Sequence, residues 1–164
     1  GYCQGSYYYN DGPGGYPTNA ATSYVVIDNN YSGFGYPDPT DPMKVTVAHE
    51  FNHGVQAAHD INEPTWYKEA TSTWIEDVVY DSINDYRNYL SQFLNSLYQS
   101  IDYHNGSLRW YGSCVWNFYL YENFGYDIIV DNFNDSGRID CEPKGLLALM
   151  LLMLAGGLAV LRRP

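Results

Sequence analysis

Basic side chains are scarce in this sequence, which has 8 Lys and Arg against 19 Asp and Glu among 164 residues. Residues 1–143 hold 5 of the basic residues and all 19 acidic ones, a net charge of 5 − 19 = −14. Residues 144–164 hold three basic residues and no acidic one. Phosphate backbones and anionic headgroups are repelled by such an acidic body. We therefore expect no nucleic acid and no anionic membrane surface among its partners.

Cysteine is also rare. Cys3, Cys114 and Cys141 are too few for a disulfide scaffold, and none of them has the CxxC spacing of a metal knuckle. One bridge, between Cys3 and Cys114, stays open for a chain in an oxidising compartment. The sequence also opens at Gly1 without an initiator Met or an apolar leader, so we expect an N-terminal part of the protein to be missing.

Helical patterns dominate the centre of the chain. Residues 1–22 predict a loop, and the β-branched run over 23–28 predicts a strand. Asp41-Pro42 has the character of a helix start, and the following helix, to Ala58, places His49 and His53 opposite an apolar face. That apolar face is formed by Met43, Val47, Phe51, Val55 and Ala58. Further helices are predicted over residues 65–80, 82–101, 112–123 and 127–133.

The first of these helices contains His49-Glu50-Phe51-Asn52-His53. Two histidines four residues apart lie one helical turn apart on one face, so both imidazoles can reach a single metal ion. The glutamate after the first histidine then projects beside the metal, where it can take a proton from a water molecule. The pattern predicts a zinc site with His49 and His53 as ligands and Glu50 as general base.

Two residues are candidates for the third ligand. His59 follows His53 at the spacing of a three-histidine motif, but that motif has a helix-breaking glycine where this chain has Gln56. Glu69 lies 16 residues after His53 on the next predicted helix, where an antiparallel arrangement completes a His₂Glu site. We favour Glu69 and expect His59 to lie on the surface or at the helix end.

The segments VTVAHEFNHGVQ, WYKEATSTWIEDVVYDSINDY and WYGSCVWNFYLYENFG together resemble a family of secreted bacterial metallopeptidases of the gluzincin group. The resemblance covers about residues 23–133. It implies zinc as the cofactor, His49, His53 and Glu69 as its ligands, and Glu50 as the catalytic base. It also implies an α+β, zincin-like fold, which in this chain would be a mostly helical active-site part with a small N-terminal strand region.

Two further roles follow from the resemblance. Gluzincins use a Tyr or His to stabilise the oxyanion, for which Tyr111 and His104 are the candidates. They also orient a ligand histidine with an acidic residue four positions after the ligand glutamate. That position is Thr73 here, so Glu76, Asp77 or a water molecule has to orient the histidine.

The last residues differ from the body in character. Residues 145–161 carry no charge and are flanked by Lys144 and by Arg162-Arg163, which predicts a transmembrane helix with a cytoplasmic C-terminus. The stretch from Cys141 resembles bacterial C-terminal sorting tails of the PEP or myxobacterial type, which implies a sorting peptidase as partner. An ordinary single-span anchor remains the alternative.

The sequence thus predicts a metallopeptidase domain over 1–140, truncated at its N-terminus, and a membrane or sorting tail over 141–164. The expected function is zinc-dependent hydrolysis of peptide bonds in a peptide or protein substrate. The expected location is outside the cell or at its surface. The competing interpretation is a non-catalytic surface protein, an adhesin or pseudo-peptidase, that keeps the metal-binding helices as architecture.

Overall fold

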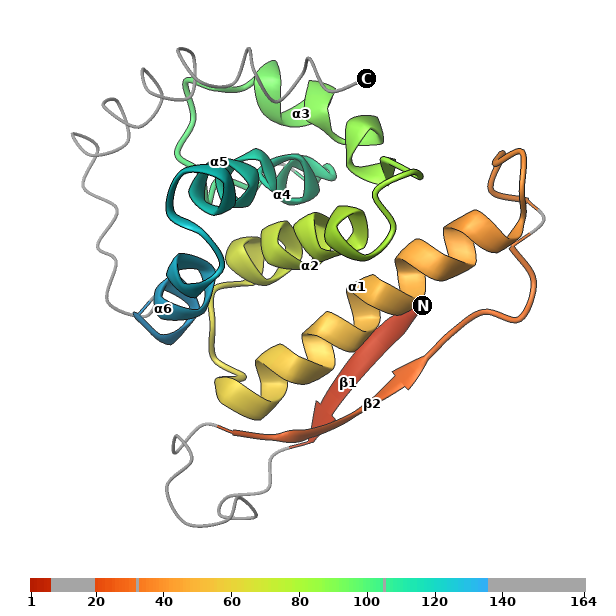
Figure 1. Ribbon diagram of the computed structural model, residues 1–164, viewed down its shortest axis with the longest axis horizontal. Helices are drawn as coiled ribbons and strands as arrows, with labels where there is room; N and C mark the ends of the chain where they lie inside the picture. The colour runs from red at the N-terminus through yellow and green to blue at the C-terminus, as the bar shows by residue number, and fades with distance from the viewer. Residues whose placement is uncertain (7–19, 32, 105, 136–164) are drawn as a thin grey trace.

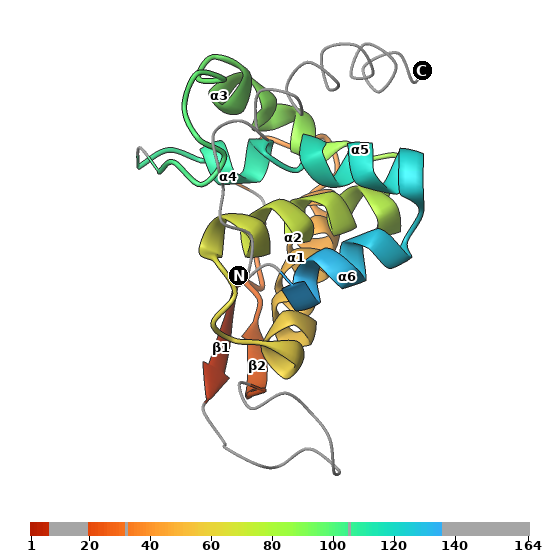
Figure 2. The ribbon, with the colours of Figure 1, turned by 90° about the vertical axis from the view of Figure 1, so that its left-hand side faces the viewer.

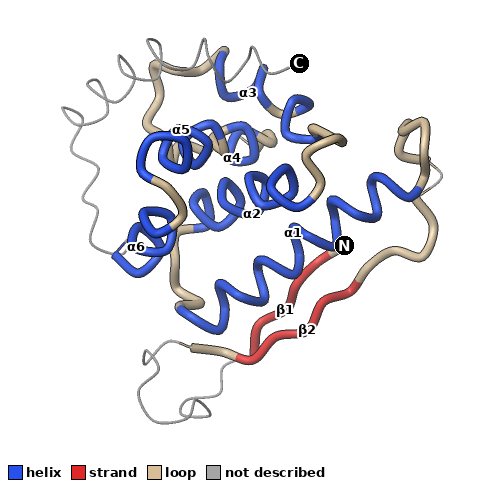
Figure 3. Tube along the Cα trace, viewed as in Figure 1, coloured by secondary structure: helices blue, strands red, loops and turns tan. Residues whose placement is uncertain are grey.

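A computed structural model of the protein describes residues 1–6, 20–31, 33–104 and 106–135. Helices make up most of the regular structure in these residues, and their one sheet is a ribbon of two five-residue strands (Figure 3). The α+β, zincin-like class expected from the sequence is therefore wrong for the part of the chain described. The reason lies in the ribbon, which is too small and too exposed to form a layer of the core.

The ribbon pairs β1 (Tyr2–Ser6) with β2 (Thr22–Val26) in antiparallel register, Tyr2 opposite Val26 and Ser6 opposite Thr22. β1 comes from a segment that the sequence predicted to be loop. Every residue of β2 is exposed, so its β-branched side chains lie at the surface. Two strands alone bury too little apolar surface to be stable by themselves, and this ribbon is supported by the helix beside it.

That helix, α1 (Thr40–His59), is the longest in the described residues. The sequence placed its start at Asp41, but the helix begins at Thr40, after an N-cap residue, Pro39, that makes no side-chain cap hydrogen bond. The Asp38 carboxylate accepts hydrogen bonds from the backbone N–H and the hydroxyl of Thr40, both at 2.8 Å. Asp41 instead pairs with Lys44 at 2.8 Å, one turn further on.

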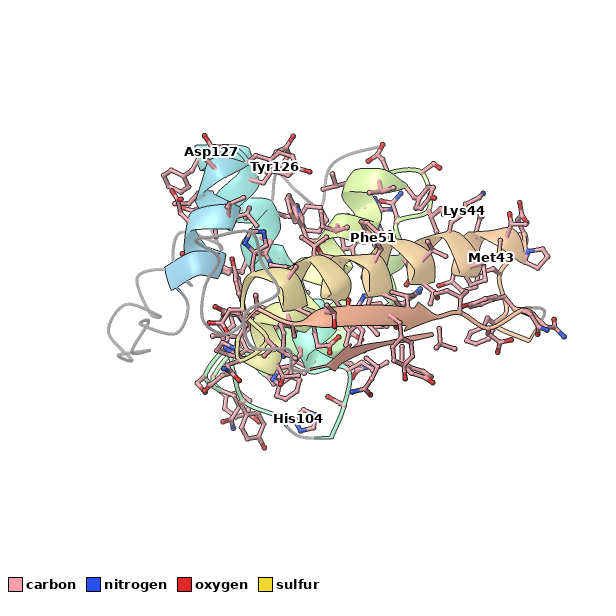
Figure 4. The ribbon with its side chains drawn as sticks, turned by 90° about the horizontal axis from the view of Figure 1, so that it is seen from below. Met43, Lys44, Phe51, His104, Tyr126 and Asp127 are labelled. Atoms are coloured by element: carbon pink, nitrogen blue, oxygen red, sulfur yellow. The ribbon has the colours of Figure 1, made fainter. Side chains whose placement is uncertain are left out.

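The apolar face of α1 that the periodicity predicted lies on the surface. Met43, Val47, Phe51 and Val55 are between 39% and 67% exposed, and Met43 and Phe51 can be seen along the helix in Figure 4. The opposite face is the buried one, and it carries the histidines. A periodic pattern identifies a face but not its neighbour. Here the neighbour of the polar face is a second helix.

This second helix is α2 (Thr65–Val79), as the sequence predicted to within one residue. α1 is packed between the ribbon on one side and α2 on the other (Figure 1). α2 in turn packs against α4 (Arg109–Gly112) and α5 (Val115–Phe124), and the turned view in Figure 2 shows the same order of elements. α2 is thus the central element, and its two faces support both the site and the core.

The region between α2 and α4 is the least regular. One helix was predicted over 82–101, but the chain forms a 3-10 turn, η1 (Asp85–Asn88), and a short helix, α3 (Leu90–Leu94). Asn84 has a positive φ of 54°, which interrupts the helix before it starts. The helix predicted over 112–123 corresponds to α5, which begins at Val115 after α4 has ended at Gly112. Gly125 caps α5 with a φ of 82°, and α6 (Asp127–Asp135) follows.

A buried arginine holds this irregular region to α4. Arg109 is fully buried, and its guanidinium donates to the Ser96 hydroxyl at 2.8 Å and to the Ile101 carbonyl at 2.9 Å. Its plane also lies over the Phe93 ring, 5.0 Å from the centroid. One side chain thereby orders the loop over 96–103 and fixes the start of α4, which carries Tyr111.

The apolar core lies beyond α2, away from the ribbon. It is made of side chains from α2, η1, α3, α5 and α6 and of the N-cap residue of α5, Cys114: Trp74, Tyr86, Leu90, Cys114, Phe118, Leu120 and Ile129. Cys3 and Cys114 are both free thiols, so the bridge between them that the sequence left open is not formed. Within the described residues no helix is long and apolar enough to cross a membrane. The tail expected over 141–164, with its apolar run 145–161, lies outside those residues.

Gly112 offers a test of this packing. A Cβ at Gly112 would lie 2.5 Å from the carbonyl oxygen of Tyr89 and 2.8 Å from the Cβ of Phe93, so backbone would have to move. We expect Gly112→Ala to lower the free energy of unfolding by about 1–3 kcal/mol in urea denaturation. Gly54→Ala is the control, because its Cβ would meet only the Ser23 hydroxyl, at 3.1 Å. That change should stay within about 1 kcal/mol. Equal losses in both variants would contradict the packing.

Candidate metal centre

The site lies where the buried face of α1 meets α2. His49 and His53 come from successive turns of α1, and Glu69 comes from the second turn of α2. The Nε2 atom of His49 is 3.1 Å from the Nε2 of His53 and 3.1 Å from the Oε2 of Glu69. The third separation, from His53 Nε2 to Glu69 Oε2, is 3.5 Å. These three side chains form a group that can hold a metal ion.

Hydrogen bonds on the far side of each imidazole fix its orientation. The Nδ1–H of His49 donates to the buried carboxylate of Glu76 at 2.6 Å. The Nδ1–H of His53 donates to the side-chain oxygen of Gln56 at 2.8 Å. The amide nitrogen of Gln56 in turn donates to the Thr71 hydroxyl, at 2.7 Å. Both rings are therefore held by acceptors that belong to α1 and α2 themselves.

With the rings oriented in this way, the Nε2 atoms of His49 and His53 and the Oε2 atom of Glu69 converge on one point between the helices. If each Nδ1 carries the ring proton, each neutral imidazole presents the lone pair of Nε2 to the other ring and to the Glu69 carboxylate. Three acceptors that converge at 3.1 to 3.5 Å repel one another unless a cation lies between them. A proton or a metal ion satisfies this need, and a metal ion satisfies all three acceptors at once.

The pKa values of the site follow from the same geometry. Burial disfavours a charged His49, but the carboxylates of Glu69 and Glu76 outweigh it and raise the pKa of this imidazole to about 9. Burial likewise opposes ionisation of Glu69, yet its hydrogen bonds with His49 and His53 hold the pKa of this carboxyl far below its ordinary value. For Glu76 burial prevails and raises the pKa to about 7, against the hydrogen bond from His49.

Glu76 is the residue that orients His49. Thr73 stands where gluzincins have an acidic residue, and the sequence left Glu76, Asp77 or a water molecule as replacements. Glu76 makes the contact. It lies seven residues after Glu69, two turns along α2, so both carboxylates are on one face of the helix. The hydrogen bond from His53 to Gln56 was not predicted from the sequence, although the position of Gln56 three residues after His53 on a helix was the available signal.

Two further residues border the group. The ring of Tyr111, from α4, is stacked on that of His49 with centroids 5.4 Å apart and planes 12° apart. Its hydroxyl hydrogen-bonds the Glu69 carboxylate, and burial together with the charges of Glu69, Glu50 and Glu76 raises the pKa of this phenol. Glu50 is 9% exposed, and its charge acts on both Tyr111 and Cys3. A Cβ on Gly1 would lie 3.1 Å from the Glu50 Cγ, so this side chain lies beside the residue that precedes β1.

The other two histidines are outside the group. His59 is the last residue of α1 and is exposed, as the sequence predicted. His104, the alternative to Tyr111, is exposed in the loop before α4, where its ring lies 4.1 Å from that of Trp110. In Figure 4 it lies on the other side of the molecule from Met43 and Phe51. Of the two candidates for the oxyanion role, only Tyr111 lies at the site.

Comparisons with known proteins add no relative to this description. The chain matches no protein-family model, no curated protein sequence and no solved structure. The similarity to gluzincins is therefore one of motifs, and the site has to be interpreted from its own chemistry.

The ligand group makes a prediction about metal affinity. Glu69→Ala removes one of three converging donors, so we expect the affinity for a divalent transition-metal ion to fall at least 100-fold, by about 3 kcal/mol. His59→Ala changes an exposed side chain at the end of α1 and should leave the affinity within about twofold. Competitive titration against a chromophoric chelator measures both. The opposite ranking would move the third ligand to His59 and contradict the site described.

A second prediction concerns pH. The pKa of His49 is raised to about 9 in the metal-free protein, so below that pH the imidazole is positively charged, with a proton on both nitrogens. A metal ion that binds Nε2 has to displace the proton there. The apparent metal affinity should therefore rise about tenfold per pH unit between pH 7 and about 9 and then level off. Calorimetry in two buffers of different ionisation enthalpy should show about one proton released per ion at pH 7. An affinity independent of pH over this range would contradict the assignment.

Proposed function

We propose that the protein is a zinc-dependent peptidase in which His49, His53 and Glu69 hold the metal ion. The observation that carries the proposal is the spacing of the three donor atoms. A tetrahedral zinc ion with bonds of about 2.0–2.1 Å separates its ligand atoms by about 3.3 Å. The observed separations of 3.1, 3.1 and 3.5 Å bracket this value. Two imidazoles and one carboxylate leave the fourth position for water, which is typical of catalytic sites.

When bound, zinc supplies a positive charge that makes water a stronger acid and polarises a carbonyl group. The chain's own residues supply the remaining chemistry. Glu50 follows His49 on α1 and is buried, and its charge acts on Tyr111, whose ring is stacked on that of His49. We assign it the transfer of a proton from the attacking water to the leaving amine. A structural metal site has no use for such a carboxylate, which favours catalysis over an architectural role.

Tyr111 is assigned the oxyanion role. Its hydroxyl already contacts the Glu69 carboxylate, and its raised pKa keeps the phenol protonated at neutral pH, so it stays a hydrogen-bond donor. A donor placed next to the metal ligands can stabilise negative charge as it develops on a carbonyl oxygen. Phenol and metal ion would then face the same oxygen atom of a peptide substrate.

Replacement of the proposed base tests the function. Glu50→Gln should keep zinc at one ion per chain and lower the turnover of a quenched fluorescent peptide library by at least 1,000-fold, because the amide cannot accept the proton. Glu122→Gln, an exposed change on α5, is the matched control and should retain full turnover.

Two results would contradict the proposal. Full activity in the Glu50→Gln protein would remove Glu50 from the mechanism. A wild-type protein that binds zinc stoichiometrically but cleaves no member of the library would favour the competing interpretation, a surface protein that keeps the metal-binding helices as architecture.

A further inference from the structure

A buried carboxylate behind the site is used by neither the metal group nor the proposed chemistry. Asp85, the first residue of η1, is 5% exposed, and its charge contributes to the raised pKa of Glu76. A buried charge needs hydrogen-bond donors, and Asp85 has three of them. They are the hydroxyl of Tyr36, the amide of Asn88 at 2.7 Å and the hydroxyl of Tyr89 at 3.0 Å.

One of these donors, Tyr89, contacts a residue of the candidate metal centre. The ring of Tyr89 packs against that of Tyr111, with centroids 5.1 Å apart and planes 45° apart. Tyr111 is in turn stacked on His49 and hydrogen-bonded to Glu69. The backbones meet at the same place, since the carbonyl oxygen of Tyr89 lies against Gly112. Tyr89 is thus in contact with Tyr111 through its ring and with the next residue through its main chain.

Tyr36 provides the contrast. It donates its hydroxyl to the same carboxylate as Tyr89, but from the loop before α1. None of the ring contacts recorded for Tyr111 among the described residues involves Tyr36; they are those with His49 and Tyr89. The two phenols therefore share the stabilisation of Asp85 and differ in whether they contact Tyr111.

We propose that Tyr89, anchored by Asp85, is a positioning residue that holds the ring and hydroxyl of Tyr111 against the metal ligands. The hydrogen bond from the Tyr89 hydroxyl to Asp85 fixes the orientation of the Tyr89 ring. That ring limits how far the Tyr111 ring can rotate away from His49. Tyr89 touches neither metal nor substrate. The inference rests on the proposed function for its kinetic test and is independent of it for its spectroscopic test.

The kinetic test compares two phenol deletions that each remove one hydrogen bond to Asp85. Tyr89→Phe should lower kcat about tenfold, because the Tyr111 side chain is no longer held in one orientation. KM should stay within twofold, because the contacts that bind the substrate are unchanged. Tyr36→Phe should leave both constants within twofold. In a Tyr111→Phe background, Tyr89→Phe should lower kcat less than twofold, since residue 111 no longer has a hydroxyl for Tyr89 to position. Equal effects of Tyr89→Phe and Tyr36→Phe, or a tenfold loss that persists without the Tyr111 hydroxyl, would overturn the proposal.

The spectroscopic test uses the full chain loaded with cobalt(II), whose visible bands respond to the ligand carboxylate of Glu69. Tyr111→Phe removes the hydrogen bond to that carboxylate and should shift the bands. Tyr89→Phe should reproduce the direction of the shift, and Tyr36→Phe should leave the bands unchanged. Bands that move in Tyr111→Phe and not in Tyr89→Phe would overturn the positioning role. These spectra decide the matter even if the protein hydrolyses no peptide, in which case the proposed function alone fails.

Discussion

The structure depends on the convergence of three acceptor atoms between α1 and α2. Two Nε2 atoms and one carboxylate oxygen lie within 3.5 Å of one another. The orientation of each imidazole is fixed by a hydrogen bond at its other nitrogen, Nδ1. Such an arrangement is unfavourable without a cation, because buried acceptors that face one another lose their hydration and gain no donor. The packing of the two helices therefore depends on a proton or a metal ion between them, and binding of a metal ion there would be coupled to their stability.

This constraint explains the unusual distribution of polarity on α1. The side buried against α2 carries His49, Glu50 and Gln56, while Val47, Phe51 and Val55 face outward. The interface between α1 and α2 is polar, and it is stabilised by a hydrogen-bond network with Thr71, Ser72 and Glu76. Apolar packing is concentrated on the other side of α2, around Trp74 and Phe118. α2 thus joins a polar layer, which contains the candidate metal ligands, to an apolar core.

The sequence predicted the three side chains that can hold a metal ion, but not the fold class. Helical geometry placed His49 and His53 on successive turns of one face. Glu69 was favoured over His59 because Gln56 stands where the three-histidine motif has a glycine. The sequence prediction failed over 82–101, where the positive φ of Asn84 and the buried contacts of Asp85 break the helix. Periodicity also identified the apolar face of α1 and the strand over 23–28 but not that both are exposed, since it does not say what an element packs against. Glu76 was one of three options until the structure showed which carboxylate reaches His49.

X-ray absorption at the zinc edge tests the central claim most directly, because it reports the donor atoms without reference to activity. The account predicts one zinc ion per chain with four light ligands near 2.0–2.1 Å, two of them imidazoles with their characteristic multiple scattering. The imidazole signal should fall to one ring in His53→Ala. A sulfur scatterer near 2.3 Å, which would indicate a thiolate such as that of Cys3, or six oxygen neighbours without an imidazole signal, would contradict the site at the junction of α1 and α2.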